Sequence, residues 1–125
     1  MTIEILNDPP AVAARAASII ADAAWDAIAE RGTFVMAVSG GETPRLMLNA
    51  LADAHIPWRA VQIVQVDERV APAAHRDRNL VMLEDALLGT TPLASEQIMA
   101  MPVEAVDLRK AAIRYAETLR DIAGT

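Results

Sequence analysis

The sequence predicts an α/β fold: an open, mostly parallel, Rossmann-like sheet with helices on both faces. Segments with helical periodicity alternate with short apolar segments along the chain, an order typical of parallel strands joined by helices. The apolar run Thr33 to Val38 lacks polar alternation, which indicates a strand buried on both faces. The chain stops after a helical segment, where another buried strand would follow. We therefore expect a single α/β domain over residues 1–125 whose sheet is truncated.

The first expected elements are a short strand and a long helix. Thr2 to Leu6 alternates and contains β-branched residues, as strands do. Asp8 can cap a helix, and the two prolines after it suit a first helical turn. From Ala11 to Arg31, small apolar residues share one face and polar residues the other. This pattern predicts an amphipathic helix that lies close to the sheet and ends at Gly32.

The later elements continue the alternation and bring the expected sheet to four strands. They are a helix from Thr43 to about Ala54, a strand at Val61 to Val66, a helix at Arg78 to Leu88, a strand at Ile98 to Ala100 and a helix capped by Asp107. Five residues form the apolar stripe of that last helix: Leu108, Ala112, Tyr115, Leu119 and Ile122.

The composition excludes several classes of function. The chain has 125 residues, 54% of them apolar, and no cysteine, which excludes disulfides, zinc–thiolate sites and a cysteine nucleophile. No apolar run approaches the roughly 18 residues that span a bilayer, and the N-terminus lacks the basic region of a secretory signal. A net charge of −6 disfavours nucleic acid as a partner. We expect a cytoplasmic protein with a small-molecule ligand.

The first candidate site follows the buried strand Thr33 to Val38. In open α/β sheets, ligands bind beyond the carboxyl ends of the strands. Gly40 and Gly41 let the backbone turn sharply and approach a ligand, and the next helix begins with amides that carry partial positive charge. The hydroxyls of Ser39 and Thr43 add donors. The segment fits a phosphate site, and it fits a plain strand-to-helix turn equally well.

The second candidate site is the Asp67-Glu68-Arg69 segment at the end of the next strand. Side-chain alternation sends Asp67 and Arg69 to one side and Glu68 to the other. In the functional interpretation, Asp67 lies near a reacting carbon and Arg69 grips an oxyanion. The alternative interpretation is a local ion pair at a polar strand end.

The loop before the third helix contains further charged residues. We expect Asp77 to cap that helix and Arg76 and Arg78 to be solvated. His75 and Asp77 together are too few ligands for a metal site, so we expect no metal.

Ser39 also has an interpretation as a nucleophile. Ala37 to Gly41 resembles a nucleophile elbow with alanine in place of the first glycine, and a serine hydrolase then needs a histidine base. His55 follows the elbow's own helix and points the wrong way along the fold. His75 comes earlier than the order of that family places its base. We therefore do not assign Ser39 as a nucleophile.

Together these segments resemble the 6-phosphogluconolactonase family, within the wider group of glucosamine-6-phosphate isomerases and deaminases. The motifs that carry the resemblance are Ser-Gly-Gly-x-Thr-Pro at residues 39–44, Trp58 before a strand, Asp-Glu-Arg-Val at residues 67–70, and Asn79 before a leucine-rich helix. The resemblance extends from Ile3 to about Ile122 and matches the N-terminal half of the family only.

The resemblance implies hydrolysis of 6-phospho-D-glucono-1,5-lactone to 6-phosphogluconate in the oxidative pentose phosphate pathway, without a metal or organic cofactor. It also implies two groups of site residues in one pocket. Those that bind the substrate phosphate are Ser39, Gly40, Gly41 and Thr43, and those with catalytic roles are Asp67 and Arg69.

The family's general base is a histidine in a downstream Asp-Gly-His-Thr-Ala-Ser-type motif. That motif is absent from this chain, and neither His55 nor His75 matches it. We therefore expect the chain to supply the phosphate-binding half of the site. Two alternatives stay open: an isomerase or deaminase of amino-sugar phosphates, which the Asp-Glu-Arg-Val segment disfavours, and a non-catalytic sugar-phosphate-binding fragment. The sequence does not predict an oligomeric state.

Overall fold

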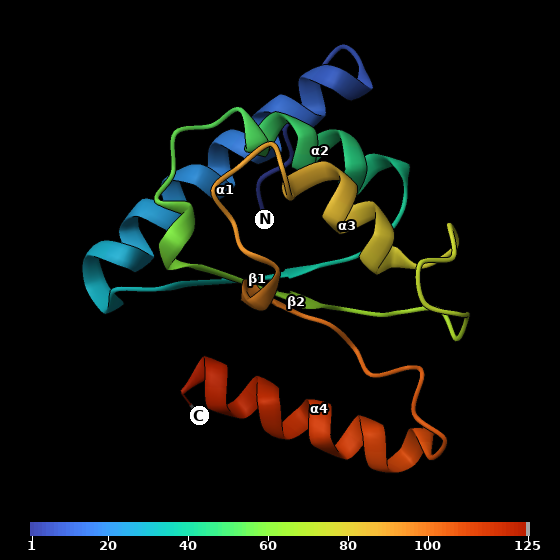
Figure 1. The fold of residues 1–125 in the computed structure, drawn as a ribbon. Coiled ribbons are helices and arrows are strands. Elements are labelled where there is room, and N and C mark those ends of the chain that lie inside the picture. The colour runs from blue at the N-terminus through green and yellow to red at the C-terminus, as the bar shows by residue number, and fades with distance from the viewer. Residues whose placement is uncertain (125) are drawn as a thin grey trace.

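The computed structural model describes residues 1–124 and confirms the α/β prediction (Figure 1). The elements follow one another in the order α1-β1-α2-β2-α3-β3-α4. The helices are α1 (Pro9–Arg31), α2 (Glu42–Ala52), α3 (Asn79–Leu87) and α4 (Leu108–Ala123). The strands are β1 (Phe34–Val38), β2 (Val61–Gln65) and β3 (Ile98–Met99).

The three strands form a parallel sheet in the order β1-β2-β3, with β2 in the centre. Phe34 pairs with Val61 at the start of the first two strands, and Ile63 pairs with Ile98. Just beyond the paired strands, the amide of Val66 donates to the carbonyl of Val38 at 3.0 Å. The chain therefore leaves β1 and β2 at neighbouring points on the carboxyl edge of the sheet.

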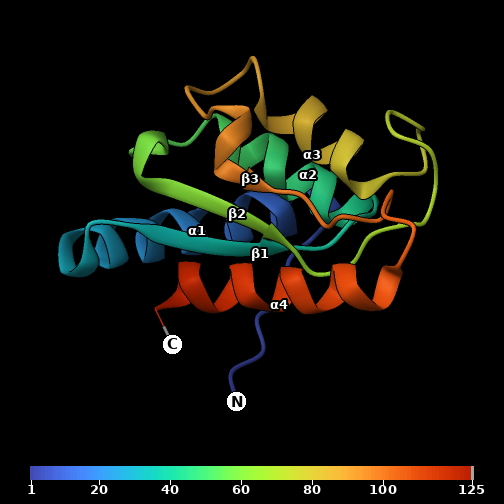
Figure 2. The same cartoon turned by 60° about the horizontal axis from the view of Figure 1, so that its bottom comes forward.

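Helices cover both faces of the sheet, as predicted. Helices α1, α2 and α3 form a layer on one face, and α4 crosses the other (Figures 1 and 2). The main core lies between the sheet and the three-helix layer. Its fully buried large side chains are Leu48, Leu51, Val61, Ile63, Leu83 and Leu87.

Helix α1 begins and ends close to the predicted residues. The carboxylate of Asp8 accepts a hydrogen bond from the amide of Ala11 at 2.8 Å, and Gly32 ends the helix with a φ of 78°. The helix is buried along a row of alanines and packs mainly against α2, with fewer contacts to β1. The small side chains thus bring α1 close to another helix more than to the sheet itself.

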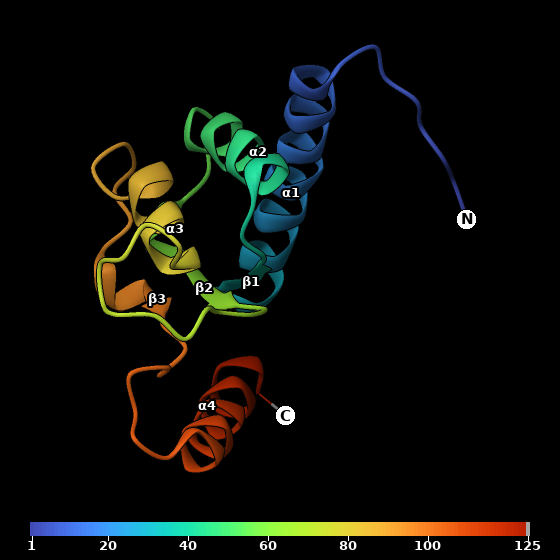
Figure 3. The same cartoon turned by 90° about the vertical axis from the view of Figure 1, so that its right-hand side faces the viewer.

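The prediction of a strand at Thr2 to Leu6 is wrong. These residues form no strand, Ile3 and Ile5 are exposed, and the segment extends away from the sheet (Figure 3). A strand needs a partner for its backbone groups, and local alternation cannot supply one. Glu4 instead pairs with Arg15 of α1 at 3.0 Å. The described sheet therefore has three strands and not four.

The face of the sheet that α4 crosses is less buried than the sequence predicts. In β1, Ala37 is exposed and Val35 is half-buried, so this edge strand is not buried on both faces. Tyr115 is the one buried residue among the five of the predicted stripe of α4, and Leu108 is exposed. In residues 1–124, no helix is long and apolar enough to cross a membrane.

Candidate functional site

The turn after β1 lies at the carboxyl edge of the parallel sheet, as predicted. Gly41 precedes the first residue of α2 with φ 115° and ψ 173°, a conformation that essentially only glycine adopts. Within residues 1–124 no side chain caps α2, so none of the described side chains binds the first amides of the helix. Ser39 and Thr43 are exposed. Donors that can bind an anion therefore meet solvent at this turn.

Gly40 brings the turn into contact with Asn79 at the start of α3. A Cβ atom built on Gly40 would lie 1.8 Å from Oδ1 of Asn79 and 2.3 Å from its Cγ, so a side chain at position 40 would require the Asn79 carboxamide to move. The side-chain nitrogen of Asn79 donates to the carbonyl of Asp67 at 3.1 Å. Asn79 thus joins the turn after β1 to the end of β2.

The side chains after β2 alternate as predicted. Asp67 and Arg69 are exposed, whereas the carboxylate of Glu68 is fully buried. Within residues 1–124, Arg69 forms no ion pair, so the local ion pair considered as an alternative does not form there. The structure brings the turn and Asp67 to one edge. Thr43 also lines a shallow hollow with the N-terminal residues 6–9.

Glu68 holds together the segments around the site. Its Oε1 accepts hydrogen bonds from the amides of Arg69 and Asn79, both at 2.7 Å. Its Oε2 accepts from the amide of Leu80 and from the side chain of Gln65, both at 3.0 Å. Burial alone would raise the pKa of Glu68, but these hydrogen bonds outweigh burial and lower it to about 2. Glu68 is therefore ionised and caps α3.

Arg78 is the buried cation beside Glu68, and its predicted solvation is wrong. Its side chain is 2% exposed, and its Nε lies 3.1 Å from Oε2 of Glu68. Its Nη1 donates to Glu104 at 2.6 Å and to the carbonyl of Ala71 at 3.1 Å. The hydrogen bond to Glu104 is the main reason that the pKa of Arg78 is raised. Two carboxylates thus compensate the buried charge.

The prediction that Asp77 caps α3 is also wrong. The amides at the start of α3 are already bound by Glu68, and Asp77 instead lies beside His75, with Oδ2 3.6 Å from Nδ1. Arg76 is exposed, as predicted. The carboxylate of Glu68 therefore caps α3 in place of Asp77.

Tyr115 of α4 forms hydrogen bonds next to those of Glu68 and Gln65. Its hydroxyl accepts from the amide of Gln65 at 2.7 Å and donates to the carbonyl of Met99 at 2.9 Å. Burial raises the pKa of this hydroxyl. The side chain of Gln65 also accepts from the amide of Met101 at 2.7 Å. The buried end of β2 is therefore tied to α4 through polar contacts.

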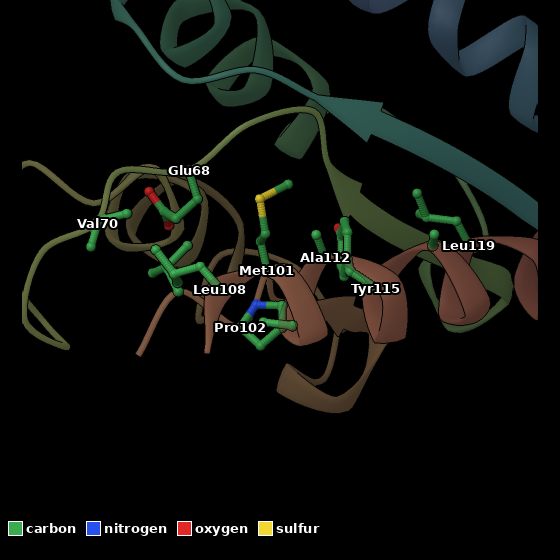
Figure 4. Close-up of a pocket in the computed structure, with 11 residues that line it drawn as sticks. Glu68, Val70, Met101, Pro102, Leu108, Ala112, Tyr115 and Leu119 are labelled. Atoms are coloured by element: carbon green, nitrogen blue, oxygen red, sulfur yellow. The ribbon is translucent and has the colours of Figure 1, made fainter. Parts of the chain in front are cut away.

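A groove of about 340 Å³ lies between α4 and the segments after β2 and β3 (Figure 4). Figure 4 shows Glu68 and Val70 toward one end, with Tyr115 and Leu119 farther along α4. The other lining residues are apolar: Met101, Pro102, Val103, Leu108, Ala111, Ala112 and Ala116. This groove offers no cation to a phosphate, so it is a poorer candidate for the predicted ligand than the edge of the sheet.

The two histidines lie in the loops that precede and follow β2. His55 follows α2 and precedes β2, which places it toward the amino edge of the sheet, opposite Ser39. His75 accepts a hydrogen bond from the amide of Asp77 at 3.2 Å. Within residues 1–124, no three His, Asp or Glu side chains gather as they do around a metal ion. The absence of a metal stays a prediction.

Sequence reasoning missed the residues that hold the site together. The sequence marks Asn79 only as a member of a motif, Tyr115 only as part of an apolar stripe, and Glu68 only as the residue on the opposite side from Asp67 and Arg69. Alternation places Glu68 on the side opposite Asp67 and Arg69, and a carboxylate on the inner side needs partners. That requirement was the available signal for Glu68, whereas the contact of Asn79 with Gly40 left no signal in the sequence.

Comparison with known proteins gives a consistent family. Residues 7–125 match the family described as "Glucosamine-6-phosphate isomerases/6-phosphogluconolactonase". The 6-phosphogluconolactonase of Nostoc sp. is 32% identical over 119 residues, which are 95% of this chain and 50% of that protein.

Two solved structures share the fold at low sequence identity. The Thermotoga maritima 6-phosphogluconolactonase superposes with a TM-score of 0.85 at 20% identity, covering 97% of this chain and 54% of that one. A monomeric glucosamine-6-phosphate deaminase superposes with a TM-score of 0.83 at 21% identity, covering 99% and 52%. The chain spans about half the length of the curated relatives that it matches over most of its residues.

Proposed function

The chain belongs to the family of glucosamine-6-phosphate isomerases and 6-phosphogluconolactonases, and we propose that it supplies the phosphate-binding half of a 6-phosphogluconolactonase. The reaction is the hydrolysis of 6-phospho-D-glucono-1,5-lactone to 6-phosphogluconate. One observation carries the proposal: the glycine turn and Asp67 meet through Asn79 at the carboxyl edge of the sheet. On the same premise, the enzyme is cytoplasmic and uses no cofactor.

In this proposal the turn after β1 binds the phosphate of the substrate. The amides at the start of α2 and the hydroxyls of Ser39 and Thr43 donate to its oxygens, while Gly40 and Gly41 let the ligand approach the backbone. The chain carries a net charge of −6, which does not attract a phosphate dianion from a distance. Binding of the phosphate therefore depends on these local donors.

The segment after β2 serves the reacting end of the substrate. Arg69 is exposed and free of any ion pair among the described residues, so its guanidinium can stabilise the oxyanion that develops when water attacks the lactone carbonyl. Asp67 lies beside the carbonyl carbon of the lactone. The attacking water also needs a general base, for which a histidine of near-neutral pKa is suited.

Binding of the stable reaction product tests the proposal. Calorimetry with the 125-residue chain should detect 6-phosphogluconate but not gluconate, which lacks the phosphate. The Arg69→Ala variant should bind about tenfold more weakly, about 1.4 kcal/mol, whereas Arg59→Ala, an exposed control before β2, should bind like the parent. Tighter binding of glucosamine 6-phosphate would favour the isomerase alternative, and equal binding of gluconate would contradict a phosphate site.

Hydrolysis by the 125-residue chain should not exceed the spontaneous rate. His55 lies toward the opposite edge, and loss of a general base alone typically lowers a rate by about 10²–10⁴-fold. A coupled assay for 6-phosphogluconate, corrected for spontaneous opening of the lactone, measures this. Robust turnover that His75→Ala abolishes would show that His75 is the base and that the proposed division of the site is wrong.

A further inference from the structure

We infer that Asn79 is a positioning residue that sets the spacing between the glycine turn after β1 and Asp67 after β2. This inference rests on the proposed function, because the two segments that Asn79 joins are those assigned to the phosphate and to the reacting carbon. Asn79 is half-buried at the first residue of α3. Its carboxamide works as a spacer between two walls of one site.

The first wall is the backbone of Gly40. Oδ1 of Asn79 occupies the space that a Cβ at position 40 would take, at 1.8 Å, and the Nδ2 atom lies 2.9 Å from the same point. A glycine at position 40 and a planar carboxamide at position 79 therefore fit one another. The approach of the turn to α3 is limited by the thickness of that carboxamide.

The second wall is Asp67. The Nδ2 group of Asn79 donates to the carbonyl of Asp67 at 3.1 Å, and the Oδ1 atom of Asp67 lies 3.4 Å from the same nitrogen. A carboxamide has donors on one side and an acceptor on the other. An aspartate at position 79 keeps the shape but loses the donor and places a second negative charge beside Asp67. Shape and hydrogen bonding can therefore be tested separately.

The base of Asn79 is rigid. Its amide donates to the buried carboxylate of Glu68 at 2.7 Å, and the preceding residue, Arg78, pairs with the same carboxylate. The carboxamide thus projects from a fixed point between the two walls. Neither the turn nor Asp67 can shift alone without losing its contact with Asn79.

The carboxamide is not needed to build α3. Glu68 binds the first amides of that helix, and the residues that anchor it in the core are Met82, Leu83 and Leu87. Removing the carboxamide should therefore affect the geometry of the site more than the stability of the fold.

A double-mutant cycle in thermal unfolding tests the contact. Gly40→Ala should lower the Tm by about 6 °C or more, because its Cβ overlaps the carboxamide. Asn79→Ala should lower it by about 3 °C or less. The double variant should lie within about 3 °C of Asn79→Ala, because the overlap is then absent. Additive losses would overturn the inference whatever the ligand binding shows.

Ligand binding tests the positioning role on the same proteins. Asn79→Ala and Asn79→Asp should raise the Kd for 6-phosphogluconate about tenfold or more, while the Tm of each variant stays close to that of the parent. Asn49→Ala, an exposed control on α2, should change neither. If the cycle is coupled but both Asn79 variants bind like the parent, the positioning role is wrong and the proposed function stands. If the parent itself does not bind 6-phosphogluconate, the proposed function fails, and the positioning role for that ligand fails with it.

Discussion

The chain ends β1 and β2 side by side on one edge of the sheet, but the two ends are held in opposite ways. After β1 the conformation of the turn requires glycine: Gly40 lies against Asn79, and Gly41 has a φ that other residues rarely adopt. After β2 it is fixed by a side chain, the buried carboxylate of Glu68, which binds three backbone amides. A turn without side chains leaves its amides open to a ligand, whereas the second end gains rigidity from a buried charge.

Because of this difference, we expect stability and ligand binding to depend on different residues. The contacts that stabilise the second end point inward, and its outward residues, Asp67 and Arg69, are exposed. The first end depends on the backbone conformation of its glycines. Substitution of Glu68 should therefore change stability most, because its carboxylate is buried and bonded, and substitutions of exposed residues at the edge should change it least.

Removing the charge of Glu68 should have the largest effect. In Glu68→Gln, Arg78 stays buried without its inner carboxylate, and breaking such a pair typically costs about 3–5 kcal/mol. Urea unfolding measures the loss. Glu117→Gln, an exposed control on α4, should change the free energy of unfolding by less than about 0.5 kcal/mol. Similar losses in the two variants would show that the second end is not held by its buried charge.

The pH dependence of stability should report the same carboxylate. The pKa of Glu68 is about 2 in the folded state, against an ordinary value of 4.5. Between these values the unfolded state binds more protons, so Glu68 contributes about 3 kcal/mol above pH 4.5, and this contribution is lost as pH falls towards 2. The difference in unfolding free energy between parent and Glu68→Gln should shrink across this window. A constant difference would contradict the lowered pKa.

Substituting Gly41 should have an intermediate effect that comes from the backbone alone. A Cβ at this position meets only an ordinary contact, 3.7 Å from Cδ of Pro44, but the conformation costs other residues about 1–3 kcal/mol. Gly41→Ala and Gly41→Asn should therefore be destabilised alike, whereas Ser39→Ala should unfold like the parent. Unfolding in denaturant distinguishes the cases. An unchanged Gly41→Ala would show that the first end does not depend on a glycine.

Removing Arg69 should have the smallest effect on stability. Its side chain is exposed, so Arg69→Ala should change the free energy of unfolding by less than about 0.5 kcal/mol while it weakens binding of 6-phosphogluconate. A larger loss of stability than of binding energy would give Arg69 a structural role and remove it from the proposed site.

Local sequence predicted the features that local interactions determine. Asp8 and Asp107 cap helices as expected, the apolar runs pair in parallel, and Glu68 lies on the opposite side from Asp67 and Arg69. The glycine turn and the end of β2 could be assigned to one edge because both follow strands of a parallel sheet.

The features that sequence missed depend on distant partners. Thr2 to Leu6 has the pattern of a strand, but nothing in that pattern tells which strand would pair with it. Arg78 is buried because Glu68 and Glu104 meet it from separate segments. The fit of Asn79 against Gly40 is likewise a contact between residues 39 positions apart in the chain. Periodicity carries no information about such contacts.

Mapping 6-phosphogluconate binding on the amide resonances of the ¹⁵N-labelled chain tests most directly whether the two ends form one site. We predict concerted shifts at the amides of residues 39–43, the amides of residues 67–69 and the side-chain amide of Asn79, all fitting a single Kd. Shifts confined to one strand end, different Kd values for the two ends, or shifts gathered along the groove beside α4 would contradict the account.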